Sequence, residues 1–178
     1  MAVLPIYVLG SPILRKETVA VTTVTPELVQ LAEDMFETMH AASGVGLAAP
    51  QVGRTERLAV VEADGHRHVL INPEIVSKEG EITWEEGCLS IPEVYGDVAR
   101  AAKVVVRATG LDGKTFEVEG SELFGVCMQH EIDHLSFLKK RKAMKAWDEE
   151  KVKYPDLIRI LLPGAPGDPH EGDGAERL

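Results

Sequence analysis

The sequence has no apolar run long enough to span a membrane, no internal repeat and only two cysteines among its 178 residues. Without such an apolar run, we expect a soluble protein. Acidic residues outnumber basic ones and give a net charge of −10, which argues against general affinity for nucleic acid. A length of 178 residues with 44% hydrophobic residues is enough for one domain with a full core.

The two cysteines, Cys88 and Cys127, leave room for at most one disulfide within the chain. The N-terminus lacks the pattern of a secretory signal, and the composition is typical of a cytosolic protein. We therefore expect a cytoplasmic protein with two reduced thiols, and treat a disulfide between them as the competing interpretation.

The most informative motif is HEIDH at residues 130–134, which places two histidines four positions apart with a carboxylate between them. On a helix, positions i and i+4 lie on the same face, so His130 and His134 can bind one metal ion. Glu131 would then lie beside the metal, where it can accept a proton from water. This arrangement is typical of a metal-dependent hydrolase, although the same spacing also occurs by chance on exposed helices.

The residues before this motif continue the face that carries the two histidines. Leu123, Val126 and Cys127 are placed on it by spacings of three and four, so we expect this apolar stripe to face the core. Histidines placed there need partners, and a metal ion supplies them. Asp133 points elsewhere, where we expect it either to pair with Arg100 or to be a solvated charge.

Cys88 is the candidate for a third ligand. It lies in WEEGCLSIP at residues 84–92, where a turn containing glycine precedes a short apolar stretch. A thiolate there can reach the helix from a neighbouring strand. Cys127 lies three residues before His130, and we interpret it as a small buried residue that lines a pocket.

Three separated motifs resemble those of the peptide deformylases. Residues 44–51 (GVGLAAPQ) are similar to the family motif GxGLAAxQ, residues 86–90 match EGCLS, and residues 129–134 (QHEIDH) match QHExDH. Residues 10–15 (GSPILR) resemble the N-terminal segment of the family. The resemblance covers residues 4–135 and implies enzymes that process new proteins during protein biosynthesis.

This resemblance implies a single divalent metal ion bound by Cys88, His130 and His134, with a fourth position open to water. The metal implied is ferrous iron, and zinc, nickel or cobalt can also occupy such a site. One thiolate and two imidazoles suit several divalent ions, so the sequence does not choose among them.

The resemblance also implies the roles of catalytic residues. Glu131 would accept the proton of the attacking water and pass it to the departing nitrogen. The side-chain amide of Gln51 and the backbone N–H of Leu89 would stabilise the oxyanion. Gln51 has a second interpretation, as an amide that caps its loop.

The implied substrate is the N-formyl-methionine end of a nascent protein, hydrolysed to formate and a free amino terminus. An apolar pocket would hold the methionine side chain, and the glycine at position 46 would let the backbone approach the ligand closely. The same residues could equally be plain core or turn positions. The predicted substrate-binding residues are Val45, Gly46, Leu89, Leu123, Val126 and Cys127.

The pattern of turns and apolar residues predicts an α+β domain in which antiparallel strands wrap around the central HExxH helix. A first helix begins at Thr25 and Pro26, and Ser121 is expected to cap the helix that carries the histidines. Asp112 and Gly113 predict the turn of a hairpin. The predicted strands cover residues 58–62, 69–72, 75–77, 81–84, 103–109 and 115–119.

The chain departs from the family pattern directly after His134. Deformylases commonly continue with a glycine and an apolar segment resembling GxLFxDR, whereas residues 135–142 here read LSFLKKRK, which indicates a deletion. Basic residues follow, and in the family a basic C-terminal helix can dock on the ribosome near the exit of the nascent chain. A solvated helix end is the alternative. The residues concerned are Lys139, Lys140, Arg141 and Lys142.

We expect residues 1–147 to form the catalytic domain and residues 148–162 a short extension. Residues 163–178 are rich in proline, glycine and acidic residues and are expected to form a disordered tail. Two other functions remain open from the sequence. One is an HExxH metallo-endopeptidase, whose third ligand usually follows the motif; the other is a weakly active or non-catalytic binder of formylated peptides.

Overall fold

The computed structural model describes residues 2–136. The segment after this range includes the predicted ribosome-docking residues Lys139, Lys140, Arg141 and Lys142, all but the first two residues of the atypical segment 135–142, and the boundaries expected at residues 147 and 162. These predictions lie outside the described residues.

Helix α1 (Pro26–Ala41) begins where the sequence predicts. The Thr25 side chain accepts a hydrogen bond from the Leu28 N–H at 3.3 Å, and Pro26 fills the first helical position, where its missing N–H costs nothing. Apolar residues on one face of α1 are buried against a sheet: Leu28, Leu31, Ala32, Met35, Phe36 and Met39.

The sheet against which α1 packs has five antiparallel strands in the order β1-β2-β3-β6-β7. The strands are β1 (Gly46–Ala48), β2 (Leu58–Ala63), β3 (His66–Glu79), β6 (Lys103–Thr109) and β7 (Thr115–Ser121). Two short 3₁₀ helices, η1 (Pro12–Arg15) and η2 (Ala49–Val52), belong to the connecting segments.

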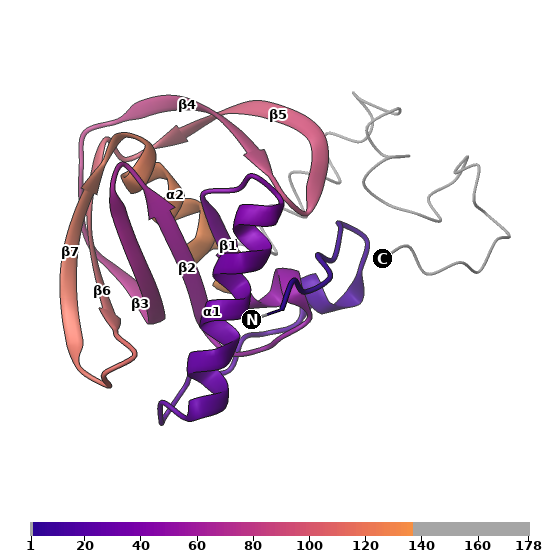
Figure 1. Ribbon diagram of the computed structural model, residues 1–178. Coiled ribbons are helices and arrows are strands. Elements are labelled where there is room, and N and C mark those ends of the chain that lie inside the picture. Colours follow the sequence, from indigo (N-terminus) through magenta and orange to yellow (C-terminus); the bar gives the residue numbers. More distant parts are fainter. Residues whose placement is uncertain (1, 137–178) are drawn as a thin grey trace, which may run out of the picture.

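Helix α2 (Glu122–Leu135) packs on the face of the sheet opposite to α1. Alternation along β2 shows this arrangement, because successive side chains of a strand point to opposite faces. Leu58 and Val60 belong to the apolar cluster around α1, whereas Val61 and Ala63 belong to the cluster around α2. Figure 1 shows α2 enclosed between this sheet and a second, smaller one.

The second sheet is the hairpin of β4 (Ile82–Cys88) and β5 (Ile91–Arg100), which pair only with each other among the described strands. It arches over α2 in Figure 1. Cys88 is the last residue of β4, and its Sγ lies 3.3 Å from His134 Nε2 on the helix. The α+β architecture predicted from the sequence, with strands around the HExxH helix, is confirmed.

Several predicted boundaries are wrong. Residues 69–72 and 75–77 belong to one strand, β3, which is irregular around Asn72 because Pro73 has no N–H to donate to the ladder. The strand predicted at 81–84 runs on to Cys88, so the glycine of WEEGCLSIP lies within β4. Strand β5 was not predicted from the sequence.

The start of α2 differs from the prediction. Ser121 occupies the N-cap position, but its side chain makes no capping hydrogen bond. Instead, Asp64 Oδ2, from the turn between β2 and β3, accepts the Phe124 N–H at 3.0 Å. A carboxylate at a helix N-terminus also interacts favourably with the helix dipole.

The stripe expected to face the core does so in part: Val126 and Cys127 are buried, while Leu123, Val126, Cys127 and His130 also line a cavity. Leu123, His130 and His134 are partly exposed. Helix α2 also buries residues of another face against the strands: Phe124, Met128, Ile132 and Leu135. No helix among residues 2–136 is long and apolar enough to cross a membrane.

Candidate metal centre and active site

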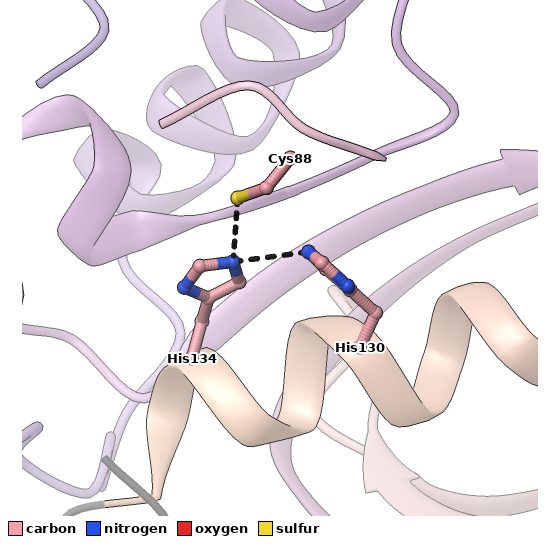
Figure 2. A group of neighbouring side chains, drawn as sticks. All are labelled: Cys88, His130 and His134. Carbon is pink, nitrogen blue, oxygen red and sulfur yellow. Dashed lines mark hydrogen bonds between the residues drawn. The ribbon is translucent and has the colours of Figure 1, made fainter. Parts of the chain in front are cut away.

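Three possible metal ligands converge from two elements of the fold. Cys88 lies at the end of β4, and His130 and His134 lie one turn apart on α2. Their ligand atoms all fall within 4.8 Å of one another. The Cys88 Sγ lies 3.3 Å from His134 Nε2, which lies 3.1 Å from His130 Nε2, as Figure 2 shows.

The hydrogen bond of the other His130 nitrogen shows that this cluster fits a divalent metal. His130 Nδ1 lies 2.8 Å from Glu86 Oε2. Because an ionised carboxylate can only accept, Nδ1 carries the proton, and the lone pair of Nε2 points toward Cys88 and His134. A thiolate and two imidazole nitrogens directed at one point form a donor set for zinc, iron and similar ions.

Both cysteines are free thiols, so the disulfide considered from the sequence is absent. Cys127 lies on α2 and donates a hydrogen bond from Sγ to the backbone oxygen of Val45 at 3.3 Å. Burial raises the pKa of the Cys127 thiol well above its usual value, and the negative charge of Glu131 acts in the same direction. Cys127 is therefore a neutral wall residue, as the sequence predicted.

Glu131 is buried beside the ligand cluster, with 3% of its surface exposed. Its Oε2 has no hydrogen-bond partner among the described residues. Burial raises the pKa of Glu131 to about 7, an effect that protonation of His130 would oppose. A bound metal cation nearby would lower this pKa. Without a metal the carboxyl group exchanges a proton near neutral pH, and a bound metal would favour its ionised form, which can accept a proton.

The contacts of Gln51 agree with its interpretation as a loop cap, while its role in stabilising an oxyanion stays a prediction. Its Oε1 accepts the N–H of Ala48 at 2.9 Å, which caps the loop before η2. Its Nε2 donates to Ser90 Oγ at 3.1 Å and lies 3.8 Å from Cys88 Sγ. The amide is therefore fixed at one end, while its donor end is directed toward the ligand cluster.

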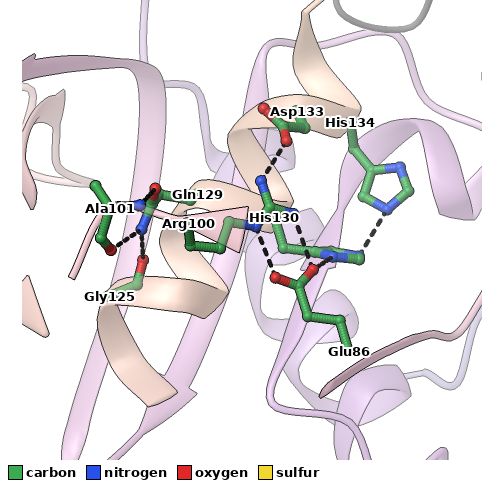
Figure 3. Close-up of polar contacts among 8 residues, drawn as sticks. All are labelled: Glu86, Arg100, Ala101, Gly125, Gln129, His130, Asp133 and His134. Atoms are coloured by element: carbon green, nitrogen blue, oxygen red, sulfur yellow. Dashed lines mark hydrogen bonds and ion pairs between the residues drawn. The ribbon is translucent and has the colours of Figure 1, made fainter. Parts of the chain in front are cut away.

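A buried ion-pair network lies behind His130. Arg100 contacts both oxygens of Glu86, at 2.6 and 2.8 Å, and Asp133 Oδ2 at 2.5 Å (Figure 3). The predicted pairing of Asp133 with Arg100 is confirmed. Burial alone would raise the pKa of Glu86, but hydrogen bonds from Arg100 and His130 outweigh it and lower this pKa to about 2.

Glu86 is a residue to which sequence reasoning gave no role. The sequence could have indicated that Glu86 lies near Cys88, because the two are two positions apart and residues at this spacing on a strand share one face. The exposure pattern of β4 alternates accordingly, with Glu86 and Cys88 among the less exposed residues.

A cavity of about 470 Å³ opens beside the ligand cluster, between α2, the segment before β1 and the β4–β5 hairpin. Cys88, His130, Glu131 and Gln51 all contribute to its wall. All six residues predicted to bind substrate also line it: Val45, Gly46, Leu89, Leu123, Val126 and Cys127. Their role in binding stays a prediction.

The sequence of the described fold matches one known family. A family model described as polypeptide deformylase matches residues 3–139. The chain belongs to the peptide deformylase family. This match agrees with the resemblance inferred from the motifs over residues 4–135.

Individual peptide deformylases are similar over most of their length. The peptide deformylase of Syntrophobacter fumaroxidans is 51% identical over 140 residues, which cover 76% of this chain and 82% of that protein. The crystal structure of a peptide deformylase from Legionella pneumophila is 43% identical and covers 86% of this chain and 98% of its own, with a TM-score of 0.73. A peptide deformylase from Synechococcus elongatus, crystallised in complex with actinonin, is 39% identical, covers 74% of this chain and 75% of its own, and has a TM-score of 0.72.

As a peptide deformylase, the chain is a metal-dependent hydrolase that removes the formyl group from the N-terminus of nascent proteins. The endopeptidase and the non-catalytic peptide binder, both open from the sequence alone, are therefore disfavoured.

Proposed function

We propose that Cys88, His130 and His134 hold a single ferrous ion, and that Glu131 is the general base of deformylation. The observation that carries this proposal is the convergence of three ligand atoms beside a buried carboxylate oxygen that has no partner among residues 2–136. When bound, the ion would supply Lewis-acid chemistry, polarising the formyl carbonyl and lowering the pKa of the attacking water.

The groups around the cluster carry the other catalytic roles. Glu131 takes the proton of the attacking water and returns it to the departing nitrogen, as a buried carboxylate beside the ligand cluster can do. The donor end of the Gln51 amide and the backbone N–H of Leu89 stabilise the negative charge that develops on the formyl oxygen. Because Gln51 is held by Ala48 and Ser90, it needs no reorganisation for this role.

The substrate is proposed to be a formyl-methionyl peptide, with its methionine side chain in the 470 Å³ cavity. A formyl carbonyl carbon carries only hydrogen, so a narrow site can accept it while excluding the bulkier acyl groups of ordinary peptide bonds. The half-exposed Val45 and the partly exposed Leu89 and Leu123 give the cavity an apolar wall suited to methionine.

The test measures formate release from a short formyl-methionyl peptide by the full chain, purified anaerobically with ferrous iron, with metal content determined on the same sample. Glu131→Gln should keep one metal per chain and lose about 10²–10⁴-fold in kcat. Glu122→Gln is the matched control, because it changes an exposed glutamate of the same helix. Cys88→Ala should lose the metal itself.

Wild-type turnover in Glu131→Gln would show that another group is the base. Retention of metal by Cys88→Ala at wild-type affinity would remove Cys88 from the ligand set. Comparison of iron-, zinc-, nickel- and cobalt-loaded protein then tests the choice of ferrous iron, which requires the iron form to be the most active.

We further propose a cytoplasmic location, since a catalytic Cys88 thiolate has to stay reduced. Docking on the ribosome through Lys139, Lys140, Arg141 and Lys142 also remains a proposal. These residues lie outside the described part of the chain, and co-sedimentation of the full chain with ribosomes tests it.

A further inference from the structure

The ligand set of the proposed metal centre is divided between two bodies. Cys88 belongs to the two-stranded sheet of β4 and β5, whereas His130 and His134 belong to α2, which packs on the five-stranded sheet. A rotation of the hairpin relative to α2 would carry the thiolate away from the imidazoles. A contact that fixes the hairpin to the helix would therefore fix the ligand set.

Arg100 makes such a contact. It is the last residue of β5, and its guanidinium binds Glu86 on β4 with two parallel hydrogen bonds and Asp133 on α2 with a third nitrogen. Only 12% of the Arg100 side chain and 8% of the Glu86 side chain are exposed, whereas 32% of the Asp133 side chain is exposed. Charged hydrogen bonds shielded from water in this way are stronger and more directional than surface pairs.

Glu86 extends this contact to a metal ligand. The same Oε2 that accepts from Arg100 Nη2 also accepts from His130 Nδ1. Arg100 thus holds the carboxylate that determines which nitrogen of His130 faces the cluster. A carboxylate in this position also fixes the ring orientation of a metal-binding histidine.

The backbone beside Arg100 is anchored to the same helix. The Gln129 side chain accepts the Ala101 N–H and donates to the Ala101 carbonyl oxygen, both at 3.0 Å, and donates to the Gly125 oxygen at 3.1 Å. Figure 3 shows Gln129 on one side of Arg100 and Asp133 on the other. The backbone next to Arg100 is therefore held in place while the guanidinium contacts Glu86 and Asp133.

We propose that Arg100 is a positioning residue that clasps the β4–β5 hairpin to α2 and so holds Cys88, His130 and His134 together before the metal binds. The inference rests on the metal centre of the proposed function. It predicts that loss of the clasp weakens metal retention even though no ligand has changed.

The experiment loads the full chain anaerobically with cobalt and measures the rate constant of its release into excess chelator. Arg100→Lys keeps the positive charge but cannot make the planar two-point contact with Glu86. The matched control is Arg107→Lys, because Arg107 also donates two hydrogen bonds to a glutamate, both to Oε1 of Glu117 on the β6–β7 hairpin, where both side chains are 50% exposed. The cobalt–thiolate absorption bands report the ligand geometry in each protein.

Arg100→Lys should release cobalt about 10–100-fold faster than wild type, with altered absorption bands, and Arg107→Lys should match wild type. Asp133→Asn, which weakens the arm to α2 by removing its negative charge, should release cobalt faster than wild type but more slowly than Arg100→Lys. If Arg100→Lys does not fold, the release rate of Asp133→Asn tests the inference in its place.

Wild-type release and an unchanged spectrum in the folded Arg100 variant would overturn the inference while leaving the metal centre intact, as would wild-type release by Asp133→Asn. Equal acceleration in Arg107→Lys would also overturn it, since the effect would then be a general loss of stability. A wild-type chain that binds no cobalt would refute the metal centre itself, and the inference with it.

Discussion

At the residue scale, the position of Glu131 depends on the absent side chain of Gly46, because the two residues occupy the same corner of the cavity. A Cβ atom on Gly46 would lie 2.6 Å from Cys127 Sγ and closer still to Glu131 Oε1. Neither neighbour can easily move, since Cys127 is tied to the Val45 oxygen and Glu131 is buried. The glycine is therefore required by the site and not only by a turn.

We expect Gly46→Ala to lower kcat/KM for the formyl peptide at least tenfold, because the new methyl group displaces the Glu131 carboxylate by several tenths of an ångström or more. Gly96→Ala is the control, since a Cβ atom on Gly96 would meet nothing within 4 Å. Steady-state kinetics on both metal-loaded variants provide the measurement. Equal kcat/KM values for the two would mean that the alanine is accommodated without moving Glu131.

At the element scale, the start of α2 shows how a distant residue can replace a local cap. Asp64 caps the helix from the β2–β3 turn and does so with a φ of 52°, a left-handed conformation that aspartate and asparagine tolerate better than other residues do. Ser121 stands at the cap position without a capping bond. The stability of this end of α2 therefore depends on a residue 60 positions away.

Replacing Asp64 by Ala should lower the free energy of unfolding by about 1–2 kcal/mol, because the capping acceptor and the tolerance for positive φ are both lost. Asp64→Asn keeps the acceptor and the tolerance for positive φ, so it should lower the free energy of unfolding by less. Ser121→Ala should stay within about 0.5 kcal/mol of wild type. Urea unfolding of the three variants decides between the caps, and a larger loss in Ser121→Ala than in Asp64→Ala would reverse the assignment.

A second element-scale feature is a stack of rings between β3, β7 and α2. The ring centroid of His68 lies 5.8 Å from that of Phe116 and 5.6 Å from that of Phe124, and the His66 ring is stacked on Phe124 at 4.7 Å. Burial lowers the pKa of His68 below its usual 6.5, and the neighbouring His66 charge adds to this effect. The unfolded chain thus binds a proton at His68 more readily than the folded chain does.

This difference gives His68 a defined effect on stability. The favourable contribution of neutral His68 is complete above pH 6.5 and is lost as the pH falls through its lower folded pKa. His68→Phe should therefore lose less stability than wild type when the pH falls from about 7 to about 5, a window set by the ordinary histidine pKa. Urea midpoints measured across this range should converge or cross, and parallel curves for the two proteins would contradict the prediction.

The elements that could be predicted from the sequence are those fixed by local chemistry. The Thr25 cap marks the start of α1, and the alternating residues of Lys103–Thr109 mark β6, whose bounds agree with the prediction. Strand β5 escaped prediction because Pro92, Gly96 and its acidic residues disfavour strands, and only pairing with β4 stabilises it.

The candidate site, too, could be predicted from the sequence only in part. The spacing of His130 and His134 within one helix is visible in the sequence, and the scarcity of cysteine pointed to Cys88. The links made by Glu86 and Arg100 depend on how the hairpin lies over α2, which no local pattern encodes. The start of α2 at Glu122 could be located, but its cap could not, because Asp64 becomes a neighbour only after β2 and β3 pair.

At the scale of the whole molecule, the hairpin is attached to the rest of the fold at a few points. Ser90 accepts the Leu9 N–H at 2.8 Å and a bond from Gln51, and further polar links run from Cys88, Glu86, Arg100 and Ala101 to α2. The five-stranded sheet, by contrast, is packed by a helix on each face. A metal bound by Cys88 and the two histidines would add one more link between the β4–β5 hairpin and α2. The hairpin is the part that is attached at fewer points.

Removal of the metal should therefore loosen the molecule unevenly. A ligand present at 100 times its dissociation constant stabilises the state that binds it by about 2.7 kcal/mol, and openings that break the site lose this contribution. We expect chelation to accelerate amide hydrogen exchange in Ile82–Cys88 and Ile91–Arg100, with little change in Leu58–Ala63 and Lys103–Thr109. Cys88→Ala is the control and should show the same exchange with and without metal. Equal acceleration in both sheets would mean that the metal stabilises the fold as one cooperative unit, and that the hairpin is not the part that it secures.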